Sequence, residues 1–233
     1  YMASRNDEAT EVLPPPGPRK YWTRQEVAHW LLERLSETTP TIVGIDHGFS
    51  FPIRYFETHQ IVPDWDVFLR DFHQHWPTDG QHVYVDFVRD GSVGNGAQRT
   101  GSAKWRRLTE QRCRAKSVFH FDCQGSVAKS THSGLPWLLF LREKLGSHLH
   151  FWPFDGFTVP SGRSAVVEAY PALYKHRFPG TVSMSGDQQD AYAIASWLKH
   201  SDVTGELQTA MHPTMDPAMQ LMARTEGWIL GVA

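Results

Sequence analysis

The apolar residues of this chain recur at two spacings, and each spacing predicts one kind of element. Spacings of three and four residues place side chains on one face of a helix. They predict helices over 24–36, 64–76, 135–145, 187–199 and 217–224. The first of these follows Thr23, which stands three residues before Glu26 in the pattern of a capping box.

Shorter apolar runs predict strands. Residues 41–46 and 165–169 are the clearest, because each is a continuous apolar run of strand length. Weaker strand patterns cover 49–56, as a hairpin partner of the first run, and also 82–88 (strand or helix), 117–121, 148–154 and 228–232. Strands mixed with helices predict an α/β layer fold.

Two segments lack apolar periodicity, and they mark the limits of the predicted domain and of an insertion within it. Residues 1–20 are polar and end in a proline-rich stretch, so we expect an N-terminal arm and helix over 1–40. One domain then covers 41–233. The glycine-rich residues 90–102 predict a flexible loop, which opens a basic insertion near 90–116.

The composition is typical of a globular protein, and the formal net charge is only -2 over 233 residues. Affinity for nucleic acid would therefore have to come from a local patch. The two cysteines, Cys113 and Cys123, match no metal or redox spacing, which favours a cytoplasmic protein. The longest apolar run, 135–141, is too short to span a membrane, so we expect no membrane partner.

Two acidic residues are placed at apolar strands. Asp46 ends the first strand, which puts its carboxylate at the edge of the sheet; the alternative is an acid that starts a turn beside Gly48. Glu168 lies within the second strand, where an acid is costly unless it is paired, ligating or exposed. Its alternative role is that of a salt-bridged strand residue.

Two further acids open the helix predicted over 187–199. Ser185 and Gln188 have the spacing of a capping box, so Asp187 falls in the first turn, where the helix dipole favours an acid. That is an adequate structural role for Asp187. Asp190 shares a helix face with Ile194, which points toward the body of the protein, so Asp190 needs a partner there. A metal ion would be a suitable one.

Asp46, Glu168 and Asp190, with Asp187 as an auxiliary group, are therefore the candidate catalytic and metal-ligating residues. Hard cations can catalyse the hydrolysis of nucleic acid by activating water. Two ions roughly 3.5–4 Å apart stabilise both the attacking and the leaving oxygen. Mg²⁺ or Mn²⁺ would be the cofactor, because both prefer oxygen ligands. We expect the three main carboxylates in one metal shell, with Asp46 bridging two ions.

These acids lie in short motifs that resemble a known family. The motifs are Gly44-Ile45-Asp46-His47-Gly48, Glu168-Ala169-Tyr170-Pro171, Asp187-Gln188-Gln189-Asp190-Ala191 and Glu226-Gly227-Trp228-Ile229. In their order, from about residue 41 to residue 232, the chain resembles the uncharacterised family of predicted nucleases with an RNase H fold. The third motif also resembles the last catalytic helix of Holliday-junction resolvases. The resemblance implies an RNase H-like mixed five-stranded sheet flanked by helices, with the acids as metal ligands.

A basic stretch separates the first two acidic motifs and is the candidate nucleic-acid-binding surface. Its cations are Arg99, Lys104, Arg106, Arg107, Arg112, Arg114 and Lys116. With Trp105 they could follow a phosphate backbone and stack a base. The alternative is a solvated basic loop.

The sequence thus predicts a metal-dependent phosphodiesterase that acts on DNA or RNA. The alternative is a non-catalytic nucleic-acid-binding or partner-binding protein on the same fold, which would need the basic stretch but not the acids. Residues 44–48 also resemble the first phosphate loop of the actin-like ATPases. That function requires a second lobe and a second glycine-rich phosphate loop, for which the chain is too short.

Overall fold

A small parallel sheet forms the centre of the molecule in a computed structural model that describes residues 1–233. Its strands are β1 (Ile42–Ile45), β2 (Leu149–Phe151) and β3 (Ser164–Glu168), in the order β1-β3-β2. Both pairings are parallel, and Ile45 of β1 lies opposite Glu168 of β3. The carboxyl ends of β1 and β3 therefore meet at one edge of the sheet.

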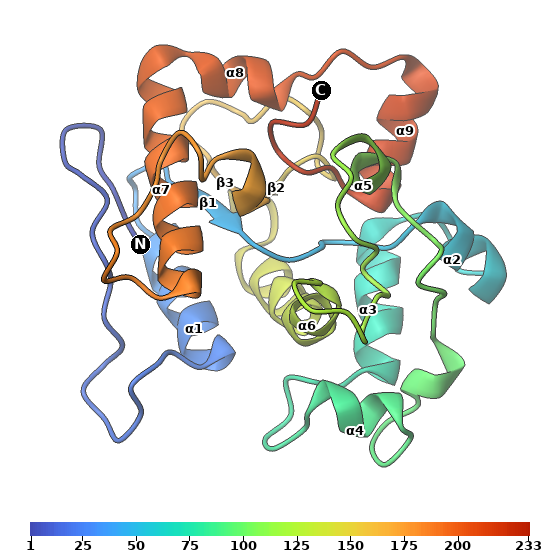
Figure 1. Cartoon of the computed structure of the whole chain (residues 1–233). Helices are drawn as coiled ribbons and strands as arrows, with labels where there is room; N and C mark the ends of the chain where they lie inside the picture. Colours follow the sequence, from blue (N-terminus) through green and yellow to red (C-terminus); the bar gives the residue numbers. More distant parts are fainter.

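Nine α-helices surround this sheet (Figure 1). They are α1 (Arg24–Leu35), α2 (Ile53–His59), α3 (Trp65–His75), α4 (Val85–Arg89), α5 (Leu108–Arg112), α6 (Ala128–Leu145), α7 (Gly186–Thr204), α8 (Glu206–Met211) and α9 (Pro217–Glu226). Three short 3-10 turns cover Gly96–Gln98, Gly146–His148 and Pro171–Leu173.

Two hydrophobic cores lie on opposite faces of β3. Val166 belongs to a core of 25 buried residues that is built mainly from α1, α2, α3 and α6. Val167, the next residue, belongs to a second core of 14 buried residues, together with side chains of α7 and α9. Because successive strand residues point to opposite faces, β3 is shared by both cores.

The five predicted helices are confirmed, and their starts have the expected chemistry. The capping box of Thr23 and Glu26 precedes α1, and that of Ser185 and Gln188 precedes α7. α6 begins seven residues before the predicted start at 135, so Pro136 lies inside the helix rather than in its first turn. The strands predicted over 41–46, 148–154 and 165–169 are also confirmed.

The predicted RNase H-like mixed five-stranded sheet is wrong, because the sheet has three strands and all of them are parallel. Residues 49–56 form no hairpin: Pro52 is the N-cap of α2, which begins at Ile53. Residues 82–88 contain the start of α4, in which Val85 and Val88 are buried at helical spacing. Residues 228–232 contribute only a single bridge, between Ile229 and Glu168.

The failed strands share a physical cause. Phe49, Phe51, Val118 and Phe119 are almost completely buried, yet they fill the first core from irregular segments. A short apolar run therefore indicated burial correctly but not backbone conformation. None of the helices is long and apolar enough to cross a membrane.

Candidate functional site

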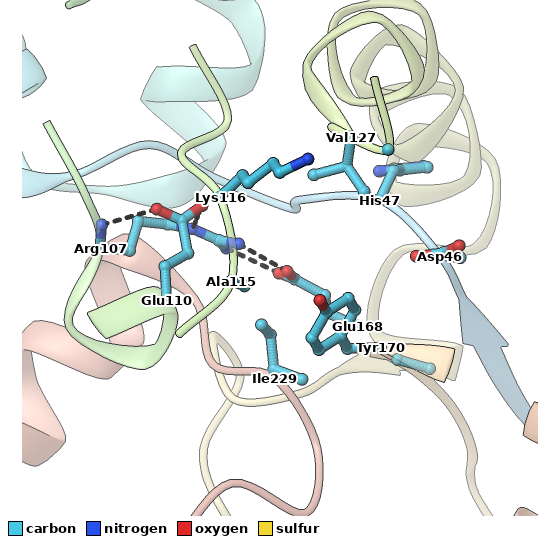
Figure 2. Close-up of a pocket in the computed structure, with 12 residues that line it drawn as sticks. Asp46, His47, Arg107, Glu110, Ala115, Lys116, Val127, Glu168, Tyr170 and Ile229 are labelled. Atoms are coloured by element: carbon cyan, nitrogen blue, oxygen red, sulfur yellow. Dashed lines mark hydrogen bonds and ion pairs between the residues drawn. The ribbon is translucent and has the colours of Figure 1, made fainter. Parts of the chain in front are cut away.

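A small cleft lies at the sheet edge where β1 and β3 end (Figure 2). Asp46, Glu168 and Tyr170 line it from the strand ends, and Arg107 and Lys116 line it from the segment that includes α5. Its volume is about 20 Å³, which is enough to hold one water molecule. The cleft thus brings two of the predicted acids to one place.

Glu168 is bound by a buried arginine. Arg107 donates from Nη2 to Oε1 of Glu168 at 2.6 Å and from Nη1 to Oε2 at 2.7 Å. The backbone N–H of Phe49 donates to the same Oε2 at 3.1 Å. Both oxygens of Glu168 are therefore engaged, as Figure 2 shows. Of the two roles considered for Glu168, the salt-bridged strand residue is the one present in this structure.

Arg107 is itself held by further acceptors. Its Nε donates to Glu110 Oε1 at 3.0 Å, and its Nη1 also donates to the carbonyl oxygen of Glu226 at 3.3 Å. Only 1% of Arg107 is exposed. Burial alone would lower the pKa of Arg107, but the charges of Glu168 and Glu110 outweigh this effect and raise it. Arg107 is a fixed cation at the floor of the cleft.

Two glycines lie beside this guanidinium. A Cβ on Gly48 would lie 3.4 Å from Arg107 Nη2 and 2.5 Å from Val118 Cγ1. A Cβ on Gly227 would lie 3.4 Å from Arg107 Nη1, and Gly227 has a φ of 79°, which disfavours other residues. Gly48 is therefore required by the close approach of Val118, and Gly227 by its backbone conformation.

Glu226 of the last motif has a structural role. Its Oε1 accepts a hydrogen bond from the backbone N–H of Ile53 at 2.6 Å, and its Oε2 accepts one from Leu108 at 2.7 Å. These are the first residues of α2 and α5. One carboxylate thus satisfies the N-termini of two short helices, where a negative charge is favourable.

Asp46 lies in a different electrostatic environment from Glu168. Burial, followed by the charges of Asp190, Glu168 and Asp187, raises the pKa of Asp46 to about 7, and Lys175 opposes the shift. Asp190 is the largest of the charged causes. The structure therefore places Asp46 in the field of all three other candidate acids.

Asp190 approaches Asp46 because α7 packs closely on β1. A Cβ on Gly44 would lie 2.6 Å from Cγ2 of Ile194, so only glycine permits this approach. Asp190 lies one turn before Ile194 on α7 and forms an ion pair with Lys175. Asp187 is exposed in the first turn of α7, in the position predicted for it.

Two of the three carboxylates predicted to share a metal shell are bound to basic side chains in this structure. Glu168 is bound to Arg107, and Asp190 is bound to Lys175. No group of three or more His, Cys, Asp or Glu side chains is arranged to hold a metal ion. The site divides instead into a Glu168–Arg107 part and an Asp46–Asp190 part.

His47 stays neutral between these parts. It is buried, and its Nδ1 lies 2.9 Å from the carbonyl oxygen of Gly48, so Nδ1 is the protonated nitrogen. Burial lowers the pKa of His47 to about 4. This residue therefore adds no positive charge to the cleft at neutral pH.

The basic stretch does not form one continuous surface. Arg99 binds Asp71 with Nε to Oδ2 at 2.8 Å. Arg106 donates to the carbonyl oxygens of Glu110 at 2.6 Å and Ala115 at 2.7 Å. Together with buried Arg107, these residues hold the fold. They are not free to follow a phosphate backbone.

Four cations of the basic stretch remain exposed: Lys104, Arg112, Arg114 and Lys116. Arg112 donates to the carbonyl oxygen of Ala233 at 2.8 Å. Lys116 contacts the carbonyl oxygen of Gln124 and lines the cleft. Trp105 is half-buried, with the guanidinium of Arg54 5.3 Å from its ring centre. Contact with nucleic acid stays a prediction for these exposed residues.

Sequence reasoning missed the ion pairs that define the site. It assigned Arg107 to nucleic-acid contact, although Glu110 stands three residues later, a spacing that pairs side chains within a helical turn. It gave no role to Lys175 and did not recognise Glu226 as a helix cap. Comparisons with protein-family models, with curated proteins and with solved structures find no match to this chain.

Proposed function

We propose that this chain is a metal-dependent phosphodiesterase acting on DNA or RNA, with Asp46 and Asp190 as the carboxylates of a divalent-cation site. The observation that carries the proposal is the position of Asp46 at the end of β1, beside the end of β3 and under the close packing of α7 on Gly44. Burial and the charges of three other carboxylates raise its pKa to about 7. A carboxyl group held in such a field gains stability when a cation enters.

The donor set fits one hard cation better than two. Asp46 and Asp190 supply carboxylate oxygens, the ligand type that Mg²⁺ and Mn²⁺ prefer. Mg²⁺ in proteins is often held by one or two carboxylates, with waters and substrate phosphates completing its shell. Two carboxylates are therefore sufficient. Lys175 would release Asp190 when the cation binds, since both compete for that carboxylate.

The residues around the cleft have separate roles in this proposal. A divalent cation there would acidify a water molecule and offset the charge of the phosphate. Asp46, whose pKa is about 7 without a cation, would lose its proton when the cation binds and would serve as a ligand. Lys116 is exposed at the cleft and carries a positive charge toward the phosphate oxygens. Neutral His47 leaves the local negative field undiminished.

The first test combines metal binding with cleavage. Mn²⁺ is titrated into metal-free protein by calorimetry, and labelled single-stranded, duplex and branched DNA and RNA are then incubated with the loaded protein. Asp46→Asn keeps the size of the side chain but removes its charge. We expect this variant to cleave at least about 100-fold more slowly, which corresponds to about 3 kcal/mol of lost barrier lowering.

Asp202→Asn is the matched control, because Asp202 is an acid on the same helix as Asp190, where it binds Arg5 rather than the site. It should leave cleavage and Mn²⁺ affinity unchanged. Wild-type protein that binds no Mn²⁺ would contradict the proposal. Protein that binds nucleic acid without cutting any substrate would instead support the non-catalytic alternative.

A further inference from the structure

We infer that Arg107 takes the place of a second metal ion: it holds Glu168 out of the metal shell, so that the site binds one divalent cation and not two. This inference rests on the proposed function and concerns the same site. It assigns Arg107 a positioning role, because Arg107 acts through Glu168.

The first step is the occupancy of Glu168. Its two oxygens accept three hydrogen bonds, of which two come from one guanidinium at 2.6 and 2.7 Å. Such a bidentate arrangement fixes the plane of the carboxylate as well as its position. A metal that used Glu168 as a ligand would have to compete with this bound cation.

The second step is that Arg107 cannot easily move away. Besides Glu168 it binds Glu110 and the carbonyl oxygen of Glu226, and it is 1% exposed. Gly48 and Gly227 lie beside the guanidinium, since a Cβ at either position would be in van der Waals contact with it, at 3.4 Å. Removing one partner of a buried ion pair leaves a buried charge uncompensated, which is strongly unfavourable.

The third step is the contrast with Asp46 and Asp190. No arginine forms an ion pair with either of these carboxylates; the ion pair on this side is that of Asp190 with Lys175, which is half-buried. A lysine ammonium is a point charge on a long stem and holds a carboxylate less rigidly than a guanidinium. The cation therefore enters on the Asp46–Asp190 side, while the Glu168 side keeps Arg107.

The number of bound ions tests the inference on unmodified protein. Calorimetric titration with Mn²⁺ should give one site per chain. Electron paramagnetic resonance of protein with excess Mn²⁺ should show isolated ions, without the coupling expected for two ions about 4 Å apart. Two coupled ions would overturn the inference and leave the proposed function standing, whereas no binding at all would overturn both.

Glu168→Gln and Asp46→Asn separate the roles of the two strand-end acids. We expect Asp46→Asn to raise the Mn²⁺ dissociation constant at least about tenfold. Glu168→Gln should raise it by clearly less, because Glu168 contributes only its charge to the field around Asp46 and no ligand oxygen. Glu168→Gln that weakens binding as much as Asp46→Asn would identify Glu168 as a ligand and overturn the inference. Melting temperature and circular dichroism establish that each variant is folded, and the measurement on unmodified protein does not depend on either.

Discussion

The fold changes the ionisation of Asp46, the residue at the centre of the proposed site. It is partly buried at the end of β1, and its pKa is raised to about 7. In an unfolded chain an aspartate loses its proton near pH 3.9. Between these two values the folded protein binds more protons than the unfolded chain, so its stability falls as pH rises. The field that favours a cation thus destabilises the metal-free protein.

Asp46→Asn should remove this pH dependence in metal-free protein. We expect the variant to gain stability relative to wild type as pH rises from about 4 to about 8, by at most on the order of 4 kcal/mol. Urea unfolding at several pH values in the presence of a chelator measures the difference. Asp202→Asn should follow the wild-type profile. A constant difference between Asp46→Asn and wild type across this range would mean that the Asp46 carboxyl titrates normally.

At the scale of elements, the site depends on how closely α7 packs against β1. Gly44 is the contact point, and Ile194 of α7 lies against it. Asp190 precedes Ile194 by one turn, so the separation of helix and strand sets the separation of the two carboxylates. The affinity of the proposed cation site therefore depends on backbone packing as well as on the acids themselves.

Gly44→Ala should weaken the site without altering any charged residue. Its Cβ would lie 2.6 Å from Ile194 Cγ2, so α7 must shift outward. We expect a loss of about 1–3 kcal/mol in stability from overpacking, together with weaker Mn²⁺ binding and a lower Asp46 pKa. Gly186→Ala is the control, because a Cβ there meets nothing within 4 Å. Unchanged Mn²⁺ affinity in Gly44→Ala would show that the helix position does not matter.

The length of each element explains whether it could be predicted from the sequence. Helices such as α3 and α7 are long enough for a repeated apolar face, and both were predicted. α5 has five residues and α8 has six, which is too short for periodicity to appear. The segment at 117–121 was misread as a strand because it is apolar and buried.

The site was predicted only in part for a related reason. Sequence order placed Asp46 and Glu168 correctly at neighbouring strand ends. It could not reveal the partner of Glu168, because Arg107 stands 61 residues away and no local pattern links them. The ion pair between Asp190 and Lys175 also joins two different segments, and no local sequence pattern links these residues. Ion-pair partners that only the tertiary structure brings together cannot be identified from the pattern of a single sequence.

The whole molecule is organised around one shared strand. β3 contributes Val166 to the first core and Val167 to the second, and Arg107 joins the end of β3 to segments that begin α5 and end α9. The two cores therefore share a strand and an ion-pair network. We expect them to unfold together.

A single unfolding transition is the corresponding prediction. Tryptophans lie in both cores, with Trp65 and Trp76 in the first and Trp152 and Trp228 in the second. Urea curves from tryptophan fluorescence and from far-ultraviolet circular dichroism should coincide. Leu198→Ala, in the second core, should cost about 2–5 kcal/mol and shift both curves equally. Two separated transitions would show that the cores are independent.

The double cap formed by Glu226 has a consequence for the order of assembly during synthesis. Its bonds reach back 173 residues to Ile53 and 118 residues to Leu108. α2 and α5 leave the ribosome long before this carboxylate does, and until it arrives their first N–H groups lack their native acceptor. Contacts of such long sequence separation form late, since the chain loses much entropy in closing them. The packing around Arg107 and the two helix starts is therefore completed only after residue 226 has been made.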